Sequence, residues 1–144
     1  MLDRLQGLPR VDSLRRYVEG LLKEKGDRVV SIVLFGSMAR GDYTIHSDYD
    51  LLVIVDGEQL NFKDRLLEYS KHSDGWVEPL TYTVDEVRQM LEDLNPLILD
   101  ALKEGLAIYD RGLWSTLKHR FEQLLKQGVI APKERGWIIK RPAT

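Results

Sequence analysis

The sequence contains no cysteine, which excludes a disulfide framework, a thiolate metal site and a cysteine nucleophile. It also lacks any apolar run long enough to span a bilayer, since the run from Leu51 to Val55 is far too short. Residues 1–12 carry Asp3, Arg4 and Arg10 among apolar neighbours and lack the unbroken apolar stretch of a signal peptide. We therefore expect a cytoplasmic protein that does not contact a membrane.

The sequence also has little excess of one charge sign over the other, with 21 Lys and Arg residues against 23 Asp and Glu residues. The formal net charge is −2, so no global field would attract a nucleic-acid backbone. Apolar residues make up 43% of the 144 residues, which is enough for one domain with a real core. We predict that residues 1–130 form this domain and that residues 131–144 form a C-terminal tail or docking arm.

Hydrophobic periodicity predicts an alternation of helices and strands. Apolar stripes and caps predict long helices over 12–25, 58–71 and 113–127, the first capped by Asp12, and short helices that begin at Thr83 and Asn95. Apolar β-branched runs predict strands over 27–35, 47–55, 76–82 and 107–109. This order predicts an α/β (α+β) protein with a small mixed sheet and helices packed on it.

Two acidic residues stand at the start of the second predicted strand. Because side chains alternate along a strand, Asp48 and Asp50 should point to the same face. Neighbouring carboxylates repel each other unless a cation lies between them, so this spacing indicates Mg²⁺. From these residues alone, the alternative is that Asp48 caps the strand while Asp50 bonds to the loop.

A Gly-Ser pair follows the first predicted strand. Gly36 would let a phosphate approach the main chain, and Ser37 with nearby amides would offer donors at the start of a short helix. Such a pair is also typical of an ordinary strand-to-helix turn. Phosphoryl chemistry needs both a phosphate cradle and a carboxylate pair, and here the two flank a single short helix and loop.

The stretch GSMARGDYTIHSDYDL has Gly-Ser, ten residues, then Asp-x-Asp. It resembles the DNA polymerase β nucleotidyltransferase superfamily, and most closely its small stand-alone members, the minimal nucleotidyltransferases. The resemblance covers residues 28–83. It implies a polymerase β-like fold and transfer of a nucleoside monophosphate from an NTP, AMP where that NTP is ATP, to a hydroxyl group. It also implies two Mg²⁺ ions held by Asp48, Asp50 and a third acidic residue.

Glu78 is the residue that would supply this third carboxylate, where the family more often has aspartate. Its alternative is a surface glutamate beside Pro79, a residue that itself predicts an edge or bulged strand. Arg40 stands at the arginine of the family's GSxARG string. It would either pair with a phosphate or buttress the loop against Asp42.

The resemblance also implies a protein partner. Small members of the family often act as antitoxins beside a helical HEPN-type ribonuclease, some by adenylylating a tyrosine of that toxin. A small-molecule or RNA acceptor, a catalytically silent binding module and an oligomer stay open as alternatives. Nucleic acid is a further alternative partner, because the tail holds Trp137 together with four cations.

Overall fold

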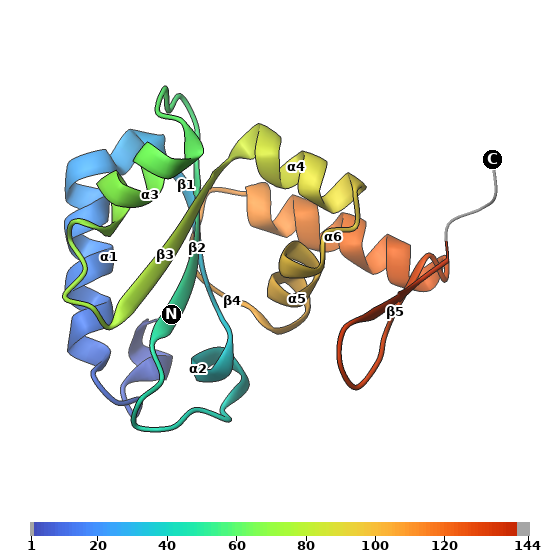
Figure 1. Cartoon of the computed structure of the whole chain (residues 1–144), viewed down its shortest axis with the longest axis horizontal. Helices are drawn as coiled ribbons and strands as arrows, with labels where there is room; N and C mark the ends of the chain where they lie inside the picture. Colours follow the sequence, from blue (N-terminus) through green and yellow to red (C-terminus); the bar gives the residue numbers. More distant parts are fainter. Residues whose placement is uncertain (1, 141–144) are drawn as a thin grey trace.

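The structure is a computed structural model that describes residues 2–140 (Figure 1). Four strands form a mixed sheet in the order β3-β2-β1-β4, and two more form a separate hairpin. The strands are β1 (Val29–Phe35), β2 (Tyr49–Val55), β3 (Val77–Thr83), β4 (Leu106–Asp110), β5 (Ile130–Pro132) and β6 (Trp137–Ile139). The α-helices are α1 (Val11–Lys25), α2 (Ser37–Arg40), α3 (Phe62–Ser70), α4 (Val84–Glu92), α5 (Pro96–Glu104) and α6 (Leu113–Lys126), and short 3-10 turns are η1 (Leu2–Leu5) and η2 (Gly26–Arg28). The predicted α/β (α+β) class with a mixed sheet is confirmed.

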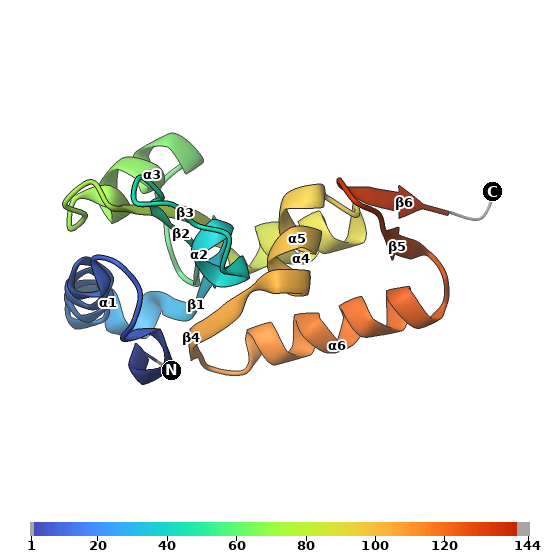
Figure 2. The same ribbon diagram turned by 90° about the horizontal axis from the view of Figure 1, so that it is seen from below.

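Helices cover both faces of the sheet. α1 and α3 lie on one face, and α4, α5 and α6 lie on the other (Figure 2). The inner strands β1 and β2 are therefore buried along nearly their whole length, as the apolar runs of the sequence predict. None of the helices within residues 2–140 is long and apolar enough to cross a membrane.

Side-chain alternation along β2 determines the face of the sheet to which its one acidic residue, Asp50, points. Tyr49 and Leu51 enter the core beneath α1, whereas Leu52 and Ile54 enter the core beneath α4, α5 and α6. Asp50 therefore points to the second face, at the end of the strand that these helices leave accessible.

The start of α1 differs from the prediction. Asp12 was expected to be the N-cap, but it lies inside the first turn, where it pairs with Arg15 at 3.7 Å. The N-cap is Arg10, which has φ 56° and ψ 32° and makes no capping bond through its side chain. A left-handed arginine is unusual, so contacts beyond the helix must determine where α1 begins.

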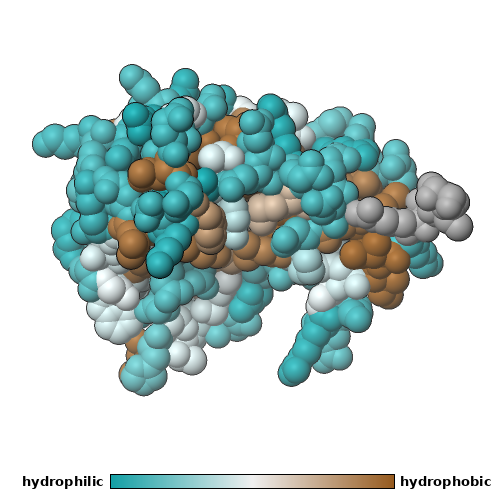
Figure 3. All heavy atoms as spheres, turned by 45° about the horizontal axis from the view of Figure 1, so that its top comes forward, coloured by the Kyte–Doolittle hydropathy of each residue, from teal (hydrophilic) through white to brown (hydrophobic). Residues whose placement is uncertain are grey.

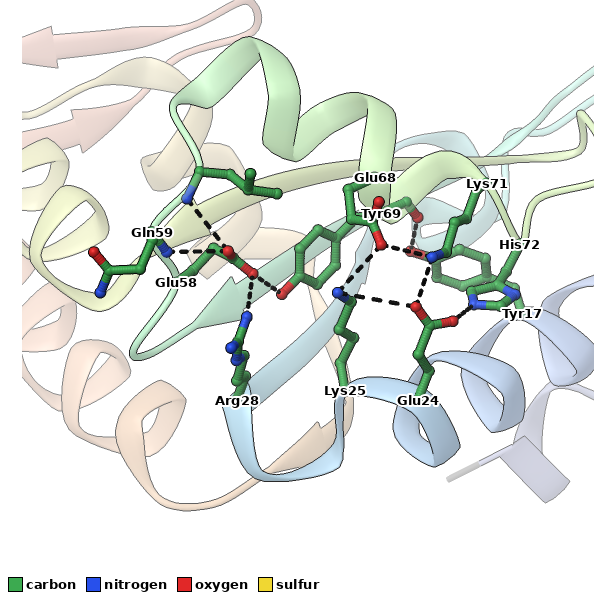
Figure 4. Close-up of polar contacts among 11 residues, drawn as sticks. Tyr17, Glu24, Lys25, Arg28, Glu58, Gln59, Glu68, Tyr69, Lys71 and His72 are labelled. Carbon is green, nitrogen blue, oxygen red and sulfur yellow. Dashed lines mark hydrogen bonds and ion pairs between the residues drawn. The ribbon is translucent and has the colours of Figure 1, made fainter.

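Polar contacts join α1 to α3 (Figure 4). The Tyr17 hydroxyl donates to the Tyr69 carbonyl at 2.7 Å, and the Tyr69 hydroxyl donates to the Glu58 carboxylate at 2.7 Å. Nearer the surface, Glu24 pairs with Lys71 at 2.7 Å and with the His72 ring. Burial and the hydrogen bond to Glu58 raise the pKa of Tyr69 well above its usual range. These contacts hold α3 against α1 on the face opposite Asp50.

Strand β3 forms an edge of the sheet, which confirms the position that Pro79 predicts. Its carbonyl groups are bonded from outside the sheet: Ser73 donates to the Val77 carbonyl at 2.7 Å, and the buried Arg65 donates to that of Thr81 at 3.1 Å. Such contacts protect an edge strand from pairing with another chain.

Arg65→Ala should lower the free energy of unfolding by about 3 kcal/mol. The change removes the ion pair with Glu86 (2.6 Å) and leaves the carbonyl groups of Leu60 and Thr81 without this donor. Urea unfolding measures the effect. Arg88→Ala, an exposed arginine on α4, is the control and should change stability by less than about 0.5 kcal/mol. Equal stability of the two variants would show that the buried contacts contribute nothing.

The C-terminal hairpin packs against α5 and α6. Its two strands pair antiparallel, and Trp137 lies edge-on to Phe121 with ring centroids 5.7 Å apart. The Trp137 indole donates to Asp100 of α5 at 2.9 Å. Ile138 and Ile139 are exposed, and Figure 3 shows apolar surface at this end of the molecule. Residues 141–144, including the tail cation Arg141, lie outside the described residues, and the docking arm stays a prediction.

Candidate active site

Three predicted site residues lie where β2 and β3 begin. Asp50 of β2 pairs in register with Glu78 of the parallel strand β3, and on its other side with Phe35 of β1. Asp48 lies one residue before β2. Because parallel strands start at the same edge of a sheet, the backbone brings these carboxylates to one place.

The Asp50 carboxyl is half-buried, and its pKa is raised to about 6. Burial is the largest cause, followed by the negative charges of Glu78 and Asp48 and by a side-chain hydrogen bond with Glu78. Arg40 acts in the opposite direction and lowers the pKa slightly. Asp50 thus interacts with both other carboxylates, and the nearby Arg40 offsets their effect on it only in part.

Their chemistry fits a hard divalent cation. Carboxylate oxygens are the ligands that Mg²⁺ prefers, and a cation would relieve the repulsion that raises the pKa of Asp50. Within residues 2–140, however, no three His, Cys, Asp or Glu side chains already converge as a metal-binding group. Binding would therefore require the three side chains to turn toward a common ion while the strands stay fixed.

Gly36 lies directly against Asp50. It has φ 78° and ψ −161°, and a Cβ atom built on it would come within 2.3 Å of the Asp50 Oδ2 atom. Only glycine combines this conformation with so close an approach. Ser37 begins α2, a single turn closed by bonds from the Ala39 and Arg40 amides to the Gly36 carbonyl. The Gly-Ser turn and the carboxylates therefore form one site.

Glu104, at the end of α5, also contacts this turn. Its Oε1 atom accepts hydrogen bonds from the Gly36 amide at 3.2 Å and from Arg40 Nη1 at 3.0 Å. Arg40 Nε donates to Asp42 at 3.2 Å, which is the loop contact that the sequence left open. Hydrogen bonds to Asp42 and Glu104 raise the pKa of Arg40. Sequence reasoning missed Glu104, because it stands 68 residues from Gly36 and no local pattern links the two residues.

Comparison with known proteins adds two kinds of similarity. Residues 14–108 match the family described as nucleotidyltransferase domain. A candidate protein adenylyltransferase of Methanocaldococcus jannaschii is 30% identical over 137 residues, which cover 88% of this chain and 91% of that protein. A second candidate protein adenylyltransferase of the same organism is 35% identical over 77 residues, or 50% of this chain and 75% of that protein.

Solved structures share the fold. A candidate nucleotidyltransferase of Sulfolobus solfataricus superposes with a TM-score of 0.52 and 22% identity, over 69% of this chain and 79% of that chain. The crystal structure of a toxin-antitoxin with AMP-PNP gives a TM-score of 0.52 and 15% identity, over 77% and 86%. At these identities the likeness concerns the arrangement of helices and strands alone.

Proposed function

This chain belongs to the nucleotidyltransferase family, and from that premise we propose that it transfers AMP from ATP to a hydroxyl group of a partner protein. One observation carries the proposal: the Gly36 turn touches Asp50, and Asp50 lies in register with Glu78. A turn suited to phosphates and a cluster suited to metal ions thus meet at one point.

In this mechanism the acceptor oxygen forms a bond to the α-phosphorus of ATP, and the bond from that phosphorus to the pyrophosphate breaks. Asp48, Asp50 and Glu78 would hold two Mg²⁺ ions, which when bound would neutralise charge on the phosphates. Ser37 and the amides of the turn would orient the outer phosphates. Glu78, exposed on the edge strand, lies where an acceptor can approach, and the hydroxyl proton would pass to this carboxylate or to solvent. Most of the rate would come from positioning and charge neutralisation.

In this proposal Arg40 would bind a phosphate, although in the structure it already pairs with two carboxylates. Its charge is already shared between Asp42 and Glu104, and Glu104 also occupies the Gly36 amide. A triphosphate at the turn would therefore compete with the carboxylate of Glu104 for the same donors. Arg40 is half-exposed, so its guanidinium can turn from one anion to the other without disturbing the core.

The relatives support the proposal that the acceptor is a protein. Those of Methanocaldococcus jannaschii are named as candidate protein adenylyltransferases, and a structure of the same fold is a toxin-antitoxin with AMP-PNP. In line with the resemblance of the sequence, we propose a HEPN-type toxin as the partner, so that the chain acts as a cytoplasmic antitoxin.

Incubation of the chain with Mg²⁺, a candidate partner and ATP tests this function. ATP labelled on the α-phosphate should transfer its label to the partner, whereas ATP labelled on the γ-phosphate should not. Mass spectrometry should then locate one added AMP on a hydroxyl side chain. EDTA should stop the reaction. Binding of Mg-ATP without transfer to protein, RNA or small-molecule acceptors would instead favour a catalytically silent binding module.

A further inference from the structure

Arg10 joins the two segments that lead into the carboxylate strands. Its Nη2 atom donates to the Ser47 carbonyl at 2.7 Å, and its guanidinium stacks on the Trp76 ring, 3.7 Å from the centroid. Ser47 immediately precedes Asp48, and Trp76 stands two residues before Glu78. The Arg10 side chain thus contacts both segments that lead into the carboxylate cluster, the one before Asp48 and the one before Glu78.

This contact ties the segment around Ser47 to the start of α1. Asp50 and Glu78 belong to the paired ladder of β2 and β3, but Asp48 precedes it. The turn before Asp48 closes on itself, since the Thr44 amide donates to the Ser47 hydroxyl at 2.9 Å and the Ser47 amide donates to the Thr44 carbonyl at 3.1 Å. These bonds shape the turn without fixing it to the sheet. Arg10 supplies a bond that fixes it to the rest of the protein.

The conformation of Arg10 indicates that these contacts are strong. Its φ of 56° lies in the left-handed region, which is unfavourable for arginine and persists only where surrounding contacts enforce it. The Tyr49 hydroxyl donates to the Pro9 carbonyl at 2.7 Å, and the Tyr49 amide donates to the Trp76 carbonyl at 2.9 Å. Arg10 Nε is buried without a hydrogen-bond partner, and within residues 2–140 Arg10 has no ion-pair partner. The side chain is therefore held by stacking on Trp76 and by the Ser47 carbonyl. An ordinary surface arginine would avoid both the strained backbone and the buried, unbonded Nε atom.

We propose that Arg10 is a positioning residue, which sets the place of Asp48 relative to Asp50 and Glu78 and thereby the affinity of the cluster for divalent cations. The proposal rests on the proposed function, because it assigns these carboxylates to metal binding. It does not require Arg10 to touch the nucleotide or the acceptor.

Arg10→Gly is the direct test, since glycine adopts the left-handed conformation without strain and so removes only the side chain. The Mg²⁺ concentration that gives half-maximal transfer should rise at least about fivefold, and kcat at low Mg²⁺ should fall about tenfold or more. KM for ATP at saturating Mg²⁺ should stay within about twofold, and excess Mg²⁺ should restore most of kcat. Arg10→Lys, which can reach the Ser47 carbonyl but cannot stack flat on Trp76, should be intermediate. Arg15→Ala on the same helix is the control and should match the wild type.

Binding of Mn²⁺ in the absence of nucleotide, followed by water proton relaxation, gives a readout that is independent of transfer. Weaker Mn²⁺ binding by Arg10→Gly, with an unfolding midpoint close to that of the wild type, supports the proposal even if the wild type transfers nothing and the proposed function fails. An unchanged Mg²⁺ dependence and unchanged Mn²⁺ affinity in Arg10→Gly would overturn it. A loss of activity that only follows the fraction of unfolded protein would also overturn it.

Discussion

Asp50→Asn should abolish nucleotide transfer and at the same time make the protein more stable. In the proposed mechanism Asp50 holds metal ions and lies against the phosphate turn, so loss of its charge should reduce kcat by about 10³-fold or more. Asparagine has nearly the same shape, so the fold and the contact with Gly36 should remain. The loss of activity would then reflect chemistry alone.

The gain in stability follows from the pKa of Asp50. Its value of about 6 in the folded protein lies above the ordinary 3.8, so the folded state binds this proton more tightly than the unfolded chain does. The stability that this carboxyl contributes is full below about pH 4 and is lost as the pH rises through about 6. After a discount for solvent screening of a half-exposed group, asparagine should gain on the order of 1 kcal/mol at pH 8. This corresponds to a rise of about 3 °C in Tm.

Thermal unfolding in EDTA at pH 8 and at pH 4 separates this effect from metal binding. The variant should be more stable than the wild type at pH 8, and the difference should vanish at pH 4. Glu122→Gln, which removes an exposed carboxyl in the interior of α6, should leave both Tm and transfer unchanged. Retention of transfer by Asp50→Asn, or a lower Tm at pH 8, would contradict the role given to this carboxyl.

Gly36→Ala should reduce transfer by about 10²-fold or more and lower the free energy of unfolding by about 2 kcal/mol. Two effects combine here. Alanine is strained at φ 78°, and its Cβ atom would lie 2.3 Å from Asp50 Oδ2, so the carboxylate must move. Steady-state kinetics and urea unfolding measure the two consequences separately.

Gly41→Ala is the matched control for this substitution. Gly41 has φ 91°, in the same loop region, but nothing lies within 4 Å of its Cβ position. It should therefore show the backbone cost with little loss of transfer. If the two variants lost transfer equally, flexibility of the turn rather than contact with Asp50 would determine activity.

Much of the fold could be predicted from local signals. The apolar runs predicted β1 and β2 as covered strands, and the caps at Thr83 and Asn95 predicted where α4 and α5 begin. The helix expected over 58–71 starts only at Phe62, because Asn61 caps it. Its buried side chains are Tyr69 and Arg65, and no rule of hydrophobic periodicity selects a buried arginine.

The candidate site was predicted unevenly for a physical reason. Strand alternation and the Gly-Ser turn are local, so Asp48, Asp50 and Gly36 could be recognised within one short stretch of sequence. Glu104 and Arg10 act through contacts between distant segments, from Glu104 to Gly36 and from Arg10 to Ser47 and Trp76. The same contacts explain the wrong cap at Asp12, since tertiary bonds to Arg10 decide where α1 starts. The metal-binding and nucleotide-binding assignments stay predictions.

The in-register pairing of Asp50 with Glu78 has a consequence for how such a protein can change. The distance between these two backbones is set by the hydrogen-bond spacing of a parallel sheet, which does not depend on the loops that precede the strands. Residues 41–46 and 71–75 can therefore vary in sequence or length without altering that distance, provided that Ser47, Asp48 and Trp76 are kept. Evolution can remodel these loops to suit a new acceptor while the acidic pair on the sheet is inherited unchanged.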